Sequence, residues 1–248
     1  MLRLPLTLDS PAANLALDEA LLELAESSGP DAEFFRIWES PTPIVVVGRS
    51  SRVWLEVDEV ACRNRQMPIL RRSSGGAAIV GGPGCLMYAV VLSYARRPQL
   101  RDLTQAHAFT LGQLAVSLRR QIRSVGVQGT SDLAISYPGQ PPRKFSGNSL
   151  RAKRSHLLYH GTLLYDFDLS LIPACLKFPP RQPEYRQARD HAAFVVNLPL
   201  AKLDVEQIVG DAWPTDGELT NWPQARVAQL VDERFSQDEW NLDYGRPD

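Results

Sequence analysis

The chain has 248 residues, 27 of them basic and 28 acidic, so its formal net charge at pH 7 is −1. Hydrophobic residues make up 44% of the sequence and charged ones 22%, which is typical of a globular domain and not of a disordered tail or a coiled coil. A net charge near zero argues against a general nucleic-acid binder, and the longest apolar runs are too short to cross a bilayer.

The three cysteines are widely spaced and form no metal-binding pattern. Cys62, Cys85 and Cys175 include no CxxC pair, so neither a disulfide framework nor a structural zinc site is indicated. The first twenty residues lack the apolar core of a signal peptide. We therefore expect a protein of the reducing cytoplasm, with neither membrane nor nucleic acid among its partners.

Helices and strands alternate irregularly along the chain. Ser10 and Pro11 begin a helix that reaches Leu24, and Gly29-Pro30 ends it. Apolar patterns and turn residues then predict, in order, strands Glu33–Trp38 and Pro43–Val47, a helix Asp58–Gln66, strands Pro68–Arg72 and Leu86–Ser93, and a helix Leu103–Ser124. They also predict a meander of strands Asp132–Tyr137, Arg143–Arg151 and His156–Asp166, and helices Asp168–Cys175, Val205–Val209 and Gln224–Phe235. This order predicts an α+β fold with a mixed, largely antiparallel sheet flanked by helices.

Charge is unevenly distributed. Residues 60–101 contain no Asp or Glu but seven arginines, and residues 133–165 contain no acid, three arginines and two lysines. A buried sheet would exclude charge in this way. A cationic pocket for an anionic ligand would do so too, because nearby carboxylates would repel the anion. Acids instead gather in residues 203–248, an acidic C-terminal subregion.

Both acid-free segments contain glycine turns. One is Ser73-Ser74-Gly75-Gly76, here named the glycine-rich turn, which follows Arg71-Arg72. Adjacent glycines allow close backbone approach to a ligand, although such a turn is equally common without function. No Gly-Lys-Ser/Thr follows, so it is not a P-loop.

The second segment contains Lys144, one of only four lysines in the chain. It begins Lys144-Phe145-Ser146-Gly147-Asn148-Ser149, and His160-Gly161-Thr162 follows. A lysine ammonium is a compact charge that can stabilise a carboxylate and a phosphate in one transition state. Taken alone, Lys144 is equally well explained as a solvated surface lysine.

Together, these motifs resemble the lipoate–protein ligase family, part of the larger group of biotin and lipoate ligases and octanoyltransferases. The matching segments follow in family order from about residue 10 to 200: Asn14–Glu19, Arg36–Trp38, Val46–Arg49, Arg71–Gly76, Asp132-Leu133, Lys144–Ser149, His160–Leu164, Asp168-Leu169 and Val196–Leu198. Trp240-Asn241 and Tyr244-Gly245 resemble the segment before the accessory domain of long ligases. The resemblance implies one biotin/lipoate ligase-like catalytic domain over residues 1–248, with the accessory domain absent or supplied by a separate chain.

The resemblance implies a two-step reaction. Lipoate or octanoate and ATP, with Mg²⁺, form acyl-AMP and pyrophosphate, and the acyl group then passes to a lysine of a lipoyl carrier domain. That carrier is the E2 subunit of a 2-oxoacid dehydrogenase or the glycine cleavage H protein. By position, Lys144 is the implied catalytic residue. The implied substrate-binding residues are Trp38, Arg72, Ser74, Gly75, Gly76 and His160, and the implied nucleotide-binding residues are Asp132, Ser146, Gly147 and Ser149, with Asp132 also a magnesium ligand. Asp18 and Glu19 read as solvent-facing helix acids without a catalytic role.

Several positions depart from the family pattern. Ala77 replaces the usual third glycine, Val80–Cys85 replaces a polar segment with a His-Asp pair, and Ser131 stands where Asn is common. Biotin is disfavoured because no second Gly-Arg pair follows Gly48-Arg49. One alternative is an octanoyl or lipoyl transferase between carrier proteins, which needs a reactive cysteine, and another is a non-catalytic lipoate-binding protein.

Overall fold

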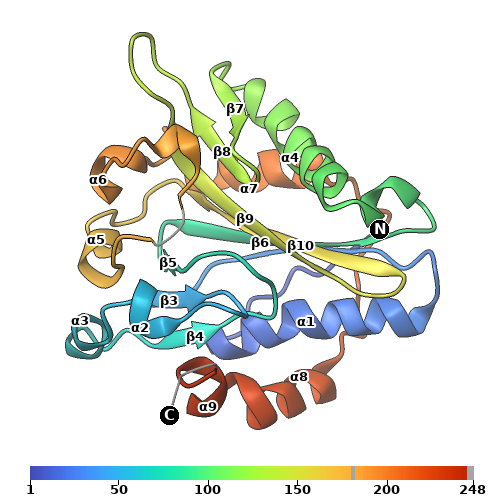
Figure 1. Cartoon of the computed structure of the whole chain (residues 1–248). Coiled ribbons are helices and arrows are strands. Elements are labelled where there is room, and N and C mark those ends of the chain that lie inside the picture. Colours follow the sequence, from blue (N-terminus) through green and yellow to red (C-terminus); the bar gives the residue numbers. More distant parts are fainter. Residues whose placement is uncertain (180–181, 245–248) are drawn as a thin grey trace.

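The computed structural model describes residues 1–179 and 182–244. Residues 180, 181 and 245–248 lie outside the described residues, so Gly245 of the Tyr244-Gly245 motif and the end of the acidic subregion are not described. Figure 1 shows a large central sheet between two groups of helices, with a small sheet at one side.

The large sheet has seven strands. In spatial order they are β1 (Leu2–Arg3), β2 (Phe34–Trp38), β6 (Cys85–Ser93), β10 (His156–Leu164), β9 (Arg143–Ala152), β8 (Asp132–Ile135) and β7 (Val125–Gln128). Strands β1 and β2 pair in parallel, and the other neighbours pair antiparallel. The predicted α+β class, with its mixed and largely antiparallel sheet, is therefore confirmed, and β8, β9 and β10 form the predicted meander.

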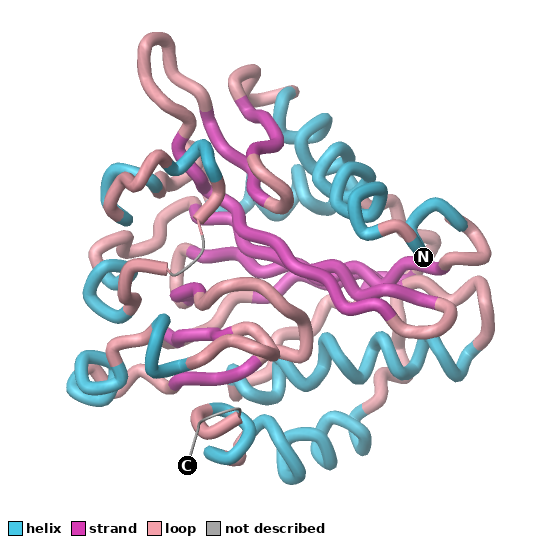
Figure 2. The backbone as a smooth tube through the Cα atoms, viewed as in Figure 1, coloured by secondary structure: helices cyan, strands magenta, loops and turns pink. Residues whose placement is uncertain are grey.

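A second sheet of three strands was not expected. It consists of β4 (Ile69–Arg71), β3 (Ile44–Val47) and β5 (Ile79–Gly81), with β3 central. All four residues of β3 are buried, as its unbroken β-branched sequence predicts. Figure 2 shows this sheet apart from the large one. The short β5, which precedes Gly82, has no periodic pattern that would predict it.

Helices cover both faces of the large sheet. The α-helices are α1 (Pro11–Ser28), α2 (Val53–Glu56), α3 (Glu59–Asn64), α4 (Leu103–Arg119), α5 (Leu171–Cys175), α6 (His191–Phe194), α7 (Lys202–Ala212), α8 (Gln224–Leu230) and α9 (Asp238–Asn241). A π-helical turn, Val231–Phe235, follows α8, and 3₁₀ turns span Pro98–Arg101 and Glu184–Arg186. Helices α4 and α7 pack on one face and α1 on the other (Figure 1). None of the described helices is long and apolar enough to cross a membrane.

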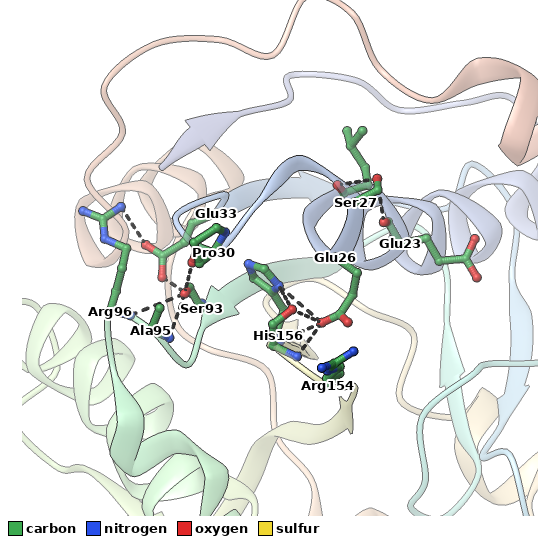
Figure 3. Close-up of polar contacts among 12 residues, drawn as sticks. Glu23, Glu26, Ser27, Pro30, Glu33, Ser93, Ala95, Arg96, Arg154 and His156 are labelled. Atoms are coloured by element: carbon green, nitrogen blue, oxygen red, sulfur yellow. Dashed lines mark hydrogen bonds and ion pairs between the residues drawn. The ribbon is translucent and has the colours of Figure 1, made fainter.

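Polar contacts fix the C-terminal end of α1 to the large sheet. Glu26 accepts hydrogen bonds from the backbone N–H groups of Ser155 and His156, at 2.9 and 2.7 Å (Figure 3). Glu33, which follows the helix, forms ion pairs with Arg96 and Arg97. The helix is therefore held in a set position along the sheet, with its other end beside the small sheet.

Candidate functional site

A cavity of about 920 Å³ lies where the two sheets meet α1. Eight of the predicted site residues line it: Trp38, Arg72, Gly76, Asp132, Lys144, Gly147, Ser149 and His160. Ser146 lines a second, adjoining cavity of about 140 Å³. Ser74 is buried behind the wall of the large cavity and Gly75 is exposed in the turn. The fold thus brings together residues that are far apart in the sequence, since Trp38 and His160 are separated by 122 positions.

Lys144 forms an ion pair at the centre of this region. Its Nζ lies 2.7 Å from Oδ1 of Asp132, and Tyr185 donates a hydrogen bond of 2.8 Å to Oδ2. Burial raises the pKa of the Tyr185 hydroxyl far above its usual value, and the Asp132 carboxylate raises it further. Tyr185 therefore keeps its proton and holds the carboxylate in place. The Lys144 side chain remains about a quarter exposed, toward the cavity.

A β-bulge in β9 gives Lys144 its direction. Leu133 pairs with Ser146 while Ala134 pairs with Lys144, so Phe145 is an extra residue. Lys144 and Gly147 are three positions apart, and a regular strand would point them to opposite faces. The bulge allows both to face the cavity. A Cβ at Gly147 would lie 2.9 Å from the Lys144 Nζ, so a larger residue here would displace the ammonium from its present position.

Arg72 holds the glycine-rich turn in its conformation. Its guanidinium donates to the carbonyls of Gly75 at 2.5 Å and of Ala77 at 3.0 Å, and to Ser74 Oγ at 3.2 Å. Ser149 lies on β9, and its Oγ donates to the Gly75 carbonyl at 2.8 Å. Burial lowers the pKa of Arg72 to about 10, although the Glu56 carboxylate acts in the opposite direction. The guanidinium donates to carbonyls and one hydroxyl, so a buried cation lines the cavity without an ion-pair partner among the described residues.

His160 belongs to a buried polar chain at the α1 side of the cavity. Its Nε2 lies 2.5 Å from Ser74 Oγ and its Nδ1 lies 3.2 Å from Oδ2 of Asp18. The Asp18 carboxylate also accepts a bond of 2.9 Å from Arg36, which is fully buried. Because the carboxylate accepts, Nδ1 carries a proton in this arrangement, and Nε2 faces the serine.

The expectation that Asp18 and Glu19 face solvent is wrong. Their exposed fractions are 2% and 1%, because both face the sheet rather than solvent. Asp18 pairs with Arg36, and Glu19 pairs with Arg151 and Arg234. These arginines come from distant strands and the C-terminal region, so the helix sequence alone does not reveal the pairing.

Sequence reasoning assigned no role to several other cavity residues. Asn148 accepts a hydrogen bond of 2.6 Å from Tyr88 and donates one of 2.8 Å to the Ser131 carbonyl. Glu56 accepts from the Ala78 backbone N–H at 2.7 Å. Asn148 lies inside the Lys144–Ser149 motif, so the motif could have identified it as a site residue. Glu56 and Tyr185 lie in segments without any motif.

The donor set for a metal ion is small. Among the described residues, no three His, Cys, Asp or Glu side chains are close enough to hold one. Asp132 is a single carboxylate, already paired with Lys144. Magnesium commonly uses one or two carboxylates and takes its other oxygens from phosphates and water, so Asp132 fits such an ion only together with a nucleotide.

The cysteines do not line the walls of the two cavities in the described part of the chain. Cys62, Cys85 and Cys175 are buried, and none of the described residues that line either cavity is a cysteine. Burial raises the pKa of the Cys62 and Cys85 thiols to about 12. A thiol with so high a pKa is almost fully protonated at neutral pH and is a poor nucleophile.

Comparison with known proteins identifies the family. Residues 10–209 match the model of the lipoyl protein ligase A/B catalytic domain. Octanoyltransferase LipM of Brevibacillus brevis is 26% identical over 94% of this chain and 95% of its own length. Lipoate-protein ligase A of Bdellovibrio bacteriovorus is 26% identical over 76% of this chain and 52% of its own length.

Solved structures share the fold. The chain superposes with a TM-score of 0.81 and 22% identity on a structure from the lipoylation system of Thermoplasma acidophilum, described as a bi-partite lipoate protein ligase and its E2 lipoyl domain; 100% of this chain and 98% of that one are covered. A lipoate-protein ligase A bound with ATP gives a TM-score of 0.76 at 22% identity, with 97% of each chain covered. With the match of the family model across most of its length, this chain belongs to the lipoyl protein ligase A/B catalytic domain family, whose members include lipoate ligases and octanoyltransferases.

Proposed function

We propose that the protein is an ATP-dependent lipoate–protein ligase, which activates lipoate or octanoate to acyl-AMP and transfers the acyl group to a lysine of a lipoyl carrier domain. The observation that carries this proposal is that Lys144 borders two adjoining cavities, and no cysteine is among the described residues that line them. Adenylation needs a cation between an acyl site and a nucleotide site. Transfer through a thioester needs a thiolate instead.

The large cavity has room for an acyl chain and for phosphates beside Asp132, and the small cavity suits the base of a nucleotide. The large cavity has apolar walls from Leu15, Trp38 and Met87, which fit an acyl chain. The small cavity has walls from Ile79, Phe145, Leu164 and other apolar side chains, with Lys144 and Ser146 at its edge, which fits a purine base. A carrier-to-carrier transferase has no need of the second cavity.

Cationic side chains would stabilise the reacting groups. In the first step the acyl carboxylate attacks the α-phosphate of ATP and displaces pyrophosphate, so negative charge develops between the two substrates. The Lys144 ammonium, held by Asp132, is placed to bind this charge. The buried Arg72 keeps the turn in place and adds a positive field inside a low-dielectric wall.

Magnesium would bind with the nucleotide at Asp132, and its chemistry there is to neutralise phosphate charge. The partner that we propose is the lipoyl domain of an E2 subunit or the glycine cleavage H protein. The E2 lipoyl domain named for the Thermoplasma acidophilum system is that protein's partner, and it is the first candidate carrier to test here.

Isotope exchange tests this proposal directly. With lipoate, ATP and Mg²⁺, the protein should exchange labelled pyrophosphate into ATP, and Lys144→Ala should slow the exchange by about 100-fold or more. Lys153→Ala is the matched control, since Lys153 lies elsewhere and pairs with Glu23. The proposal fails if no exchange occurs, both for the protein alone and with candidate accessory chains.

The second candidate is an octanoyltransferase, which the similarity to LipM over nearly the whole chain favours. Mass spectrometry of a lipoyl carrier domain separates the two. The ligase modifies it with lipoate and ATP, whereas a transferase modifies it with octanoyl carrier protein as donor. Transfer that survives Cys85→Ser and Cys175→Ser would exclude thioesters at these two residues.

A further inference from the structure

The C-terminal segment lies directly behind the glycine-rich turn. Helix α9 packs under β4, and α8 packs under α1, on the outer side of the small sheet (Figure 1). The Trp240 indole N–H donates to the carbonyl of Arg71 at 2.9 Å, and Asn241 Oδ1 accepts from the Arg71 backbone N–H at 2.9 Å. Both side chains thus bind the backbone of Arg71, two residues before the turn begins.

Arg71 connects this segment to the rim of the cavity. Its guanidinium donates to the carbonyls of Gly48 and Ser51, both at 2.8 Å, and to the carbonyl of Trp240 at 2.7 Å. Arg71 is fully buried, and successive strand residues point to opposite faces. Arg72 therefore organises the glycine-rich turn inside the cavity, while Arg71 organises the loop at residues 48–51 from behind.

These two loops also bind each other. The Arg49 N–H donates to the Ser74 carbonyl at 2.7 Å, and Ser51 Oγ donates to the Gly76 carbonyl at 3.1 Å. A Cβ at Gly48 would lie 1.9 Å from the Gly76 carbonyl oxygen. Any shift of Arg71 therefore moves both loops. Because Ser51 and Gly76 line the cavity, such a shift also changes the cavity wall.

A second contact from the same segment reaches the other side of the turn. Arg234, in the π-helical turn, pairs with Glu19, which also binds Arg151 at 2.8 Å. Arg151 lies 3.5 Å from the Ser73 carbonyl. The Arg234 guanidinium stacks on the Trp240 ring, 4.8 Å from its centre, so the two contacts form one unit.

We propose that Arg234, Trp240 and Asn241 form a clamp that positions the glycine-rich turn for substrate binding. They are positioning residues, because they act through Arg71 and Glu19 and do not line the cavity. The buried Arg71 cation depends on this segment, because its guanidinium hydrogen bonds within the described chain all go to carbonyls. The carbonyls of Trp240 and Asn241 are two of these acceptors. Without the C-terminal acceptors Arg71 must give up buried hydrogen bonds or move.

Amide hydrogen exchange tests the clamp without reference to activity. Asn241→Ala and Trp240→Phe should each speed exchange by about 10-fold at residues 48–52 and 72–77, since each removes one buried hydrogen bond. Exchange in α4, across the large sheet, should not change. Gln237→Ala is the control, since the Gln237 amide donates only within the segment, to Asp232 and Ser236.

The conservative variant Asn241→Asp separates positioning from local folding. It keeps the oxygen that accepts from Arg71 but loses the amide that donates to the Phe235 carbonyl. Exchange at residues 72–77 should stay nearer to the wild type than in Asn241→Ala. If the Asn241→Asp and Asn241→Ala variants behave alike, or if α4 exchanges faster too, the C-terminal segment is only structural and the clamp is refuted.

The kinetic readout rests on the proposed function. In the pyrophosphate exchange assay, Asn241→Ala should raise KM for lipoate by about 10-fold, the equivalent of one buried hydrogen bond, with a much smaller change in kcat. Should the protein lack ligase activity, the hydrogen-exchange result still decides for or against the clamp. An equal fall in kcat with KM unchanged would contradict it.

Discussion

At position 147 the absence of a side chain decides where the ammonium of Lys144 lies. Gly147→Ala would place a methyl group 2.9 Å from the Nζ and 3.0 Å from the Cε, so the end of the lysine must shift from its present position beside Asp132. We expect the rate of adenylation to fall by about 10-fold or more, because the misplaced charge no longer faces the reacting groups. Pyrophosphate exchange measures this.

The matched control is Gly126→Ala in β7. A Cβ there meets no atom within 4 Å, so the substitution tests the cost of replacing a strand glycine alone. Gly126→Ala should retain wild-type exchange, and both variants should keep the wild-type circular dichroism spectrum. Full activity of Gly147→Ala would show that the path of Lys144 over this glycine has no role.

Single residues differ in how far the sequence reveals them. Lys144 could be singled out because lysine is rare in this chain and because it begins a motif beside Ser146 and Gly147. The pairing of Asp18 could not be foreseen, since Arg36 is 18 positions away and contacts it only when α1 lies on the sheet. Sequence patterns report local periodicity, whereas buried ion pairs depend on tertiary packing.

At the scale of elements, the acidic side chains of α1 attach it to neighbouring elements. Burial alone would raise the pKa of Glu26, but hydrogen bonds from Ser155 and His156 outweigh it and hold the pKa below the ordinary 4.5. The folded state therefore favours the ionised form. This contribution to stability is complete above about pH 4.5 and is lost as pH falls through the lower, folded-state pKa.

We therefore expect Glu26→Gln to be less stable than the wild type at neutral pH, with the difference in Tm shrinking as the solution is acidified from about pH 5 to pH 3. Thermal unfolding by circular dichroism measures it. Glu239→Gln, at an exposed carboxylate of α9, is the control for removal of one negative charge. A gap in Tm that widens toward low pH would mean that the folded state does not favour ionised Glu26.

Long periodic elements were predictable and short ones were not. Helix α1 and the meander carry enough apolar residues to show a pattern, and strand β6 is an unbroken apolar run from Cys85 to Leu92. Strands β5 and β7 have three and four residues, and α2 has four. Each is therefore too short to show a periodic pattern of apolar residues. Helix α4 ends at Arg119, five residues before the predicted end at Ser124, because the chain turns there into β7.

At the scale of the whole molecule, the acidic C-terminal subregion is integrated into the fold. Its change in composition marks a surface rich in carboxylates, yet Val227, Leu230 and Phe235 are buried in the same core as α1 and β2. Arg226 also pairs with Glu23 of α1. A composition shift alone therefore does not mark an independently folded unit, since burial depends on a few apolar positions.

This integration predicts that a defect in the C-terminal segment destabilises the entire chain. Phe235 is fully buried, so Phe235→Ala should reduce the free energy of unfolding by about 3–5 kcal/mol. Circular dichroism and tryptophan fluorescence should report one coincident transition at a lower temperature. Leu203→Ala, at a side chain that is 76% exposed, is the control and should change stability by no more than about 0.5 kcal/mol. If Phe235→Ala instead splits unfolding into two steps, the C-terminal segment is a separate cooperative unit, and it could not transmit a fixed position to Arg71 and the glycine-rich turn.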